Sequence, residues 1–198
     1  MRPGEPHLRS GGNWLAGDDW ARVWREFTTS AFRLETLPEY RVAGEDGLLE
    51  RFRSGLPMPS GFNSAWHERL RSYRSSGRAV QRVRVVTRPP TDYQRSQFEW
   101  GYPGNSSAGE DIRVLDQDDD VVRELPAQDF WLFDDRVVVL MHYQDGLQIG
   151  RELLADTDPA DYVRYKELAM AHSTPFHRYL RRESGGLVRT DEDGRTAT

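Results

Sequence analysis

Apolar residues recur along this chain with two different periods, and each period predicts one kind of element. Segments in which apolar residues alternate with polar ones, or run together between polar turns, predict β-strands. These segments cover residues 32–36, 80–86, 111–115, 130–133, 137–143 and 148–154. Asp134-Asp135 and Asp145-Gly146 separate the last three segments and are typical of tight turns. The second half of the chain therefore predicts consecutive hairpin strands.

Apolar residues three or four apart predict helices elsewhere, and polar residues that can cap a helix precede several of these stretches. Asp18, Ser64 and Asp158 are the expected caps. The predicted helical stretches are 18–31, 48–56, 64–74, 91–100 and 159–172, with a short turn over 176–180. We expect the glycine-containing stretch after Trp100, which includes Gly104 and Gly109, to be a loop.

Strand, helix and strand followed by hairpin strands and a closing helix predict an α/β fold, bordering on α+β. We expect a mixed central sheet covered by helices, with an N-terminal helical layer. The strands that begin at Gln81 and Asp111 should form a parallel pair within it. The expected organisation is a flexible N-terminus over 1–17, one globular domain over 18–181 and a disordered tail over 182–198.

Composition narrows the possible classes of protein. Hydrophobic residues make up only 37% of the 198 residues, but six Trp, eight Tyr and eight Phe supply large side chains for a core. The chain has no cysteine, which excludes disulfides, thiolate catalysis and Cys-ligated metal sites. We find no secretory signal and no apolar window long enough to span a membrane, so we expect a cytoplasmic protein without membrane contact. The oligomeric state stays open.

The net charge of −5 conceals an uneven distribution of charges. Residues 51–88 contain nine arginines against the single acid Glu68, whereas residues 110–135 contain ten acids against two arginines. One interpretation is a nucleic-acid face on the third predicted helix, made of Arg69, Arg71, Arg74 and Arg78. The alternative is a solvated helix face that other charges of the fold neutralise, and the acidic net charge favours this alternative.

Arginines on the predicted parallel strands indicate an anion site. Arg82 and Arg84 are two residues apart and share one face of their strand, and Arg113 lies on the next strand. Backbone N–H groups around Asn105 could complete the site. The alternative is that Arg82 and Arg84 pair with Glu35, Glu99 or Glu110.

Aromatic residues follow the first of these parallel strands, where open α/β sheets bind ligands. The predicted pocket has the following ligand-binding residues: Arg82, Arg84, Tyr93, Trp100, Asn105, Glu110 and Arg113. The alternative is that Tyr93 and Trp100 pack their helix on the sheet. The expected ligand is a small anion.

Three ionisable residues are candidates for acid–base catalysis, namely Glu99, Glu110 and His142. His142 has the alternative of being a hydrogen-bonded core residue. His172 and His177 lack the spacing of a helical zinc pair, so we expect no metal and no cofactor. These candidates keep an enzyme of unknown class as an alternative to a binding protein.

Five sequence blocks carry a resemblance to a known family. They are AFRLET (31–36), QRVRVVTRPPTDY (81–93), FEWGYPGNSSAGEDIRVL (98–115), DFWLFDDRVVVLMHY (129–143) and AHSTPFHRYL (171–180). Together they resemble an actinobacterial family of domains of unknown function, family 6879, over residues 18–181. The resemblance implies a regulatory setting near helix-turn-helix regulators, which makes such a regulator a possible partner.

A more distant resemblance is to half of a phospholipase D-like domain. The catalytic His-x-Lys pair of that domain aligns with Ala127 and Asp129, and neither residue can form a phospho-histidine or bind phosphate. The resemblance therefore implies a non-catalytic domain that binds a small ligand or a regulator protein.

Overall fold

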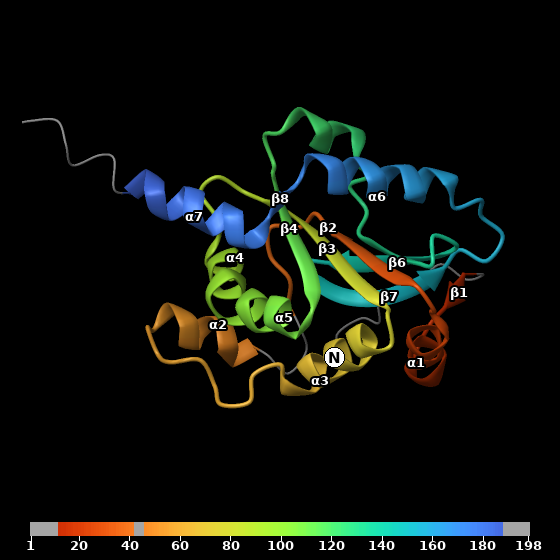
Figure 1. Cartoon of the computed structure of the whole chain (residues 1–198), viewed down its shortest axis with the longest axis horizontal. Coiled ribbons are helices and arrows are strands. Elements are labelled where there is room, and N and C mark those ends of the chain that lie inside the picture. The colour runs from red at the N-terminus through yellow and green to blue at the C-terminus, as the bar shows by residue number, and fades with distance from the viewer. Residues whose placement is uncertain (1–11, 42–45, 188–198) are drawn as a thin grey trace, which may run out of the picture.

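The computed structural model describes residues 12–41 and 46–187 and arranges them around one eight-stranded mixed sheet (Figure 1). The strand order is β1-β7-β6-β5-β2-β3-β4-β8. The strands are β1 (Asn13–Trp14), β2 (Ser30–Glu35), β3 (Ala79–Val86), β4 (Glu110–Asp116), β5 (Phe130–Phe133), β6 (Val137–Gln144), β7 (Leu147–Leu153) and β8 (Thr174–Pro175). The prediction of an α/β fold with a mixed sheet is confirmed.

The sheet has a parallel part and an antiparallel part that meet at β2. Strands β2, β3 and β4 run parallel, with Arg33 opposite Arg82 and Gln81 opposite Asp111, which confirms the predicted parallel pair. On the other side of β2, strands β5, β6 and β7 form an antiparallel meander. Both hairpin turns have positive φ values, 53° at Asp134 and Asp135 and 50° at Asp145. Aspartate adopts such positive φ values more readily than most other residues, which agrees with its occurrence in these turns.

Helices cover both faces of the sheet. They are α1 (Gly17–Glu26), α2 (Asp46–Arg53), α3 (Ser64–Ser75), α4 (Asp92–Ser96), the π-helical turn η1 (Gln97–Gly101), α5 (Tyr102–Ala108), the 3₁₀ turn η2 (Asp120–Glu124), α6 (Ala160–His172) and α7 (Phe176–Leu187). In Figure 1, α6 lies above the sheet, whereas α1 and α3 lie below it. None of the described helices combines the length and the apolar character that a membrane crossing requires.

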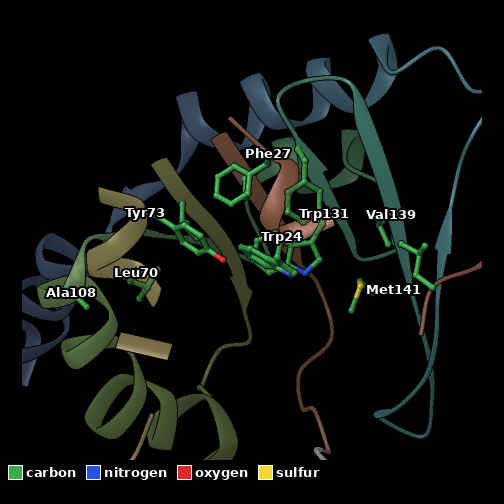
Figure 2. Close-up of a cluster of buried hydrophobic side chains, with 12 residues drawn as sticks. Trp24, Phe27, Leu70, Tyr73, Ala108, Trp131, Val139 and Met141 are labelled. Atoms are coloured by element: carbon green, nitrogen blue, oxygen red, sulfur yellow. The ribbon is translucent and has the colours of Figure 1, made fainter. Parts of the chain in front are cut away.

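Aromatic rings fill the core between the sheet and the α1–α3 layer (Figure 2). Trp24 of α1 lies at its centre, with ring centroids 4.8 Å from Trp131 of β5 and 5.8 Å from Tyr73 of α3. The opposite face buries Phe32, Leu34 and their neighbours beneath α6. Because strands alternate their side chains between faces, β2 and β5 contribute to both cores.

Several predicted boundaries and one predicted loop are wrong. The stretch after Trp100 is helical, because Pro103 is tolerated in the first turn of α5 and Gly109, with φ of 118°, ends that helix. Helix α1 ends at Glu26, and Ala31 lies in β2. The residue before α3 is Asn63 in a left-handed conformation, so Ser64 is the first helical residue and not the cap.

The two segments expected to be flexible include parts of described elements. Strand β1 lies within 1–17, and α7 continues to Leu187. The remaining parts, 1–11 and 188–198, lie outside the described residues.

Candidate functional site

Charged residues occupy the sheet face at the centre of β2 and β3, where apolar residues are the norm. Arg33 and Glu35 alternate along β2, and Arg82 and Arg84 alternate along β3, so all four side chains share the face that α1 and α3 also cover. Glu35 is 8% exposed and Arg84 is 1% exposed. Ionised groups this deeply buried need partners, because an unpaired charge in a low dielectric is costly.

Glu35 is the centre of these partnerships. Its carboxylate accepts a short hydrogen bond from Nη1 of Arg82. Nε of Arg33 lies 3.5 Å away, and Nη1 of Arg84 lies 3.7 Å away. Burial raises the pKa of Glu35, but these three guanidiniums outweigh it and lower the pKa from 4.5 to about 2.

Two further carboxylates complete the network. Glu110, at the start of β4, accepts from Nε of Arg82 at 2.8 Å. Asp129, just before β5, accepts from Nη2 of Arg33 at 3.2 Å and from the hydroxyl of Tyr40. Three guanidiniums, of which those of Arg33 and Arg84 are buried and that of Arg82 is partly buried, thus face three buried carboxylates, and the network is internally neutral. We call these six residues the ion network.

A cavity of about 490 Å³ opens beside the ion network, at the carboxyl end of β2. Glu35 lines it from the sheet, and Leu147 to Arg151 line it from β7. Its aromatic lining residues are Trp14, Tyr40, Tyr93 and Tyr143, and its cationic lining residues are Arg41 and Arg151. A neighbouring cavity of about 270 Å³ shares Tyr40, Arg41 and Tyr93 and reaches α2 and Trp100.

Arg151 is one of the two cations that line this cavity. Its Nη2 donates to Oε1 of Gln148 at 3.2 Å, and its guanidinium lies 5.1 Å from the ring centroid of Trp20. Its buried Nε has no hydrogen-bond partner, and no described carboxylate forms an ion pair with it. Burial lowers the pKa of Arg151, and the positive charge of Arg33 lowers it further, although Tyr143 acts in the opposite direction.

The structure brings together some of the predicted ligand-binding residues. Arg82, Arg84 and Glu110 lie in the ion network, in the arrangement that the sequence offered as the alternative to an anion site. Tyr93 lines both cavities, whereas Trp100 lines only the smaller one. The arginines that line the larger cavity are therefore Arg41 and Arg151, not Arg82 and Arg84.

Asn105 and Arg113 lie away from the cavities. The buried side chain of Asn105 on α5 is hydrogen-bonded to Nε2 of His67 at 3.0 Å. Arg113 donates to Oγ and to the backbone oxygen of Ser173, each at 2.9 Å, at the β4–β8 edge. Both residues hold elements together.

The three catalytic candidates do not share a centre. Glu99 is exposed, Glu110 is buried against Arg82, and His142 on β6 pairs with Glu152 of β7 at 2.9 Å. Strands β4 and β6 are four strand spacings apart, which is roughly 19 Å. Groups at that separation cannot act on one reacting atom. No group of three His, Asp or Glu suited to a metal occurs among residues 12–41 and 46–187.

Three of the four candidate arginines for a nucleic-acid face lie on α3, and the fourth, Arg78, follows this helix. Arg69 lies 5.1 Å from the ring centroid of Trp24, and Arg78 lies 4.6 Å from that of Tyr73. The side chain of Arg74 lies against Gly109. Two of the four arginines thus cover the aromatic core, which weakens the interpretation of α3 as a nucleic-acid face.

Several residues of the site were not predicted, namely Arg33, Asp129, Tyr40, Tyr143 and Arg151. A signal existed for Arg33, since Arg33 and Glu35 interrupt an apolar strand at alternate positions, as Arg82 and Arg84 do. Asp129 was considered only as a replaced phosphate ligand, whereas the structure shows an acceptor of four hydrogen-bond donors from Arg33, Thr36 and Tyr40. Nothing in the sequence marks Arg151.

A comparison with family models identifies the family of the chain. The model of a family described as "Domain of unknown function (DUF6879)" matches residues 18–181. No curated protein matches the chain.

Proposed function

We propose that this chain, which belongs to the DUF6879 family, is a non-catalytic domain that binds a small anionic ligand in the cavity beside Arg151. The observation that carries the proposal is the half-buried side chain of Arg151, which lines an aromatic cavity and forms no ion pair with any described carboxylate. An anion would supply the missing partner, and tyrosine and tryptophan rings would contact an apolar body attached to it.

The ion network supports this proposal by its internal pairing. Its guanidiniums pair with Glu35, Glu110 and Asp129, so the network is internally neutral, and Glu35 is its member that lines the cavity. A ligand anion therefore meets Arg151 and Arg41 as the available cations of the lining. Preorganised sites of this kind lose little conformational entropy when the ligand binds.

The absence of catalysis in this proposal rests on two features. Ala127 and Asp129 stand where the phospholipase D-like resemblance would require His and Lys, and Asp129 is held by Arg33 and Tyr40. The candidate acid–base residues are dispersed over the sheet. We extend the proposal to a cytoplasmic regulatory role, in which a helix-turn-helix partner senses ligand binding.

The proposal is tested by titrating the full chain with benzoate, phosphate and sulfate while its melting temperature is recorded. Since a ligand that binds only the folded state stabilises it, an anion at about 100 times its Kd should add roughly 2.7 kcal/mol to the free energy of unfolding. We expect benzoate to have the largest effect, because the lining is aromatic. Arg151→Gln should abolish that effect.

Arg71→Gln is the matched control, because Arg71 is an exposed arginine of α3 that lines neither cavity. It should leave the response to benzoate unchanged. Equal responses of the Arg151 and Arg71 variants, or no response of the native chain to any of the three anions, would refute the proposed function.

A further inference from the structure

Glu35 places a second polar group at the larger cavity, besides Arg151. Its two carboxylate oxygens have unequal surroundings. Oε1 accepts the short hydrogen bond from Arg82 and lies 3.5 Å from Nε of Arg33. Oε2 accepts no hydrogen bond from any residue that the structure describes, and Nη1 of Arg84 lies 3.7 Å from it, beyond hydrogen-bonding distance. One oxygen of this buried carboxylate therefore lacks a donor.

The oxygen without a donor is accessible from the cavity. Nη1 of Arg84 also lacks a hydrogen-bond partner, and it is enclosed completely by protein atoms, whereas Oε2 of Glu35 is not among the enclosed atoms. Glu35 keeps 11% of its side chain exposed, and it lines the cavity. Because a buried acceptor without a donor is costly, a bound group that donates to Oε2 would stabilise the folded protein.

The charges around Glu35 favour a neutral donor over a cation. The carboxylate is ionised at neutral pH, since three guanidiniums lower its pKa to about 2. These guanidiniums already balance the charges of Glu35, Glu110 and Asp129. An ammonium group at Oε2 would add a positive charge close to Arg84, which costs Coulomb energy. A hydroxyl group donates a hydrogen bond without adding a charge.

We propose that the ligand of the larger cavity is a hydroxylated aromatic carboxylic acid, whose carboxylate pairs with Arg151 and whose hydroxyl donates to Oε2 of Glu35. The inference rests on the proposed function, since Arg151 is the anion-binding residue in both. It adds the chemical class of the ligand and a second contact that fixes the orientation of the ligand.

The dimensions of the site agree with a ligand of this kind. Strands β2 and β7 are three strand spacings apart, which is roughly 14 Å between their backbones. The side chains of Glu35 and Arg151 shorten this distance, because both line the same cavity of about 490 Å³. The remaining space suits one aromatic ring with a short spacer, and the rings of Tyr40 and Tyr143 line it.

The test compares ligands and leaves the ion network intact, because a substitution of Glu35 would remove the partner of three arginines. The affinity of the full chain is measured by isothermal titration at neutral pH for three pairs of ligands. Each pair has a para-hydroxyl and a para-fluoro member, on benzoate, phenylacetate or phenylpropionate. In the pair that binds best, we expect the hydroxyl member to bind about tenfold more tightly, because it donates to a charged acceptor.

Two further measurements locate the effect. The side-chain carboxyl carbon-13 signal of Glu35 should shift more with the hydroxyl member than with the fluoro member. Arg151→Gln should weaken both members of the pair, whereas Arg71→Gln should weaken neither. A third comparison tests the charge of the donor, and para-(hydroxymethyl)benzoate should bind more tightly than para-(aminomethyl)benzoate.

The inference would be overturned by equal affinity within all three pairs, by an equal shift of the Glu35 signal with both members, or by tighter binding of the ammonium compound. If the fluoro members still bind and Arg151→Gln abolishes their binding, the proposed function survives while the inference fails. If none of these acids binds to the native chain, both proposals fail.

Discussion

At the scale of single residues, Glu35 is the side chain on which the most charges depend. It is the shared partner of Arg33 and Arg84, which are buried, and of Arg82, which is partly buried. Glu35→Gln keeps the shape of the side chain but leaves guanidiniums without a counter-charge. Because breaking a buried ion pair from one side is strongly destabilising, we expect a loss of about 3–5 kcal/mol in the free energy of unfolding, measured by urea denaturation at neutral pH.

The exposed Glu39 provides the control, and Glu39→Gln should change the free energy of unfolding by less than about 0.5 kcal/mol.

The pH dependence of the free energy of unfolding is a second readout of the role of Glu35. The pKa of Glu35 is about 2 in the fold and 4.5 ordinarily, so the unfolded chain binds more protons in that range. The stability from Glu35 is therefore complete above about pH 4.5 and is lost as the pH falls toward about 2. The Gln variant should show a shallower loss on acidification. The role of Glu35 would be contradicted if the stability of the Gln variant depended on pH as that of the native chain does. A loss below about 1 kcal/mol in the free energy of unfolding would contradict it too.

Residue-scale prediction from the sequence succeeded where spacing determines geometry. Arg82, Arg84 and Glu110 meet because two strands in parallel register must place them on one face. Tyr93 was found because residues after a parallel strand gather at its carboxyl end. Arg151 was not found, because it lies on β7, three strands from β2 in the sheet. Only the tertiary fold brings it to the same cavity as Glu35. Contacts between strands so far apart along the chain leave no periodic signal.

At the scale of elements, the turn between β5 and β6 also fixes the entry to β2. The carboxylate of Asp134 accepts from the backbone N–H groups of Thr28, Thr29 and Ser30, at 2.7, 2.7 and 3.0 Å. Asp135 has the same backbone conformation but only an ion pair with Lys166 at 2.7 Å. Two adjacent aspartates with equal φ thus have unequal roles.

Glycine substitutions separate these roles, because glycine adopts a φ of 53° without strain. We expect Asp134→Gly to cost about 2–3 kcal/mol, since three backbone donors lose their acceptor. Asp135→Gly should cost less than about 1 kcal/mol, because it removes only a partly exposed ion pair. Thermal and urea denaturation of both variants provide the measurement. Equal losses in the free energy of unfolding for the two variants would contradict a stabilising role for the hydrogen bonds that Asp134 accepts.

Strands were more predictable than the helix after Trp100 for a physical reason. Apolar alternation is set by the pleat itself, so β3 to β7 follow from it directly. Helix α5 contains Pro103 and Gly104, which individually disfavour helices. It forms nonetheless because η1 precedes it without a break and α3 packs on it, with His67 lying against Gly104. Tertiary contacts of this kind override local preference.

At the scale of the whole molecule, the two cores share the strands between them. Phe32 and Leu34 of β2 are buried under α6, while Ala31, Arg33 and Glu35 face the α1–α3 layer. Neither layer can lose its packing without exposing β2 and β5, so we expect the described domain to unfold as one cooperative unit. The ion network and the cavity therefore depend on the aromatic core in Figure 2, although no ring of Trp24 lines the cavity.

This cooperativity can be tested through Trp24, whose ring contacts include Trp131, Phe133 and Tyr73. Trp24→Ala should cost about 3–5 kcal/mol, as a large buried aromatic leaves a cavity. If the domain unfolds as one unit, tryptophan fluorescence and far-ultraviolet circular dichroism should report coincident urea transitions, and the variant should shift both by the same amount. Trp100→Ala, at the rim of the smaller cavity, should shift both less. Transitions that separate would mean that the α6 face retains structure when the aromatic core is lost, and the cavity would then belong to an independently unfolding half.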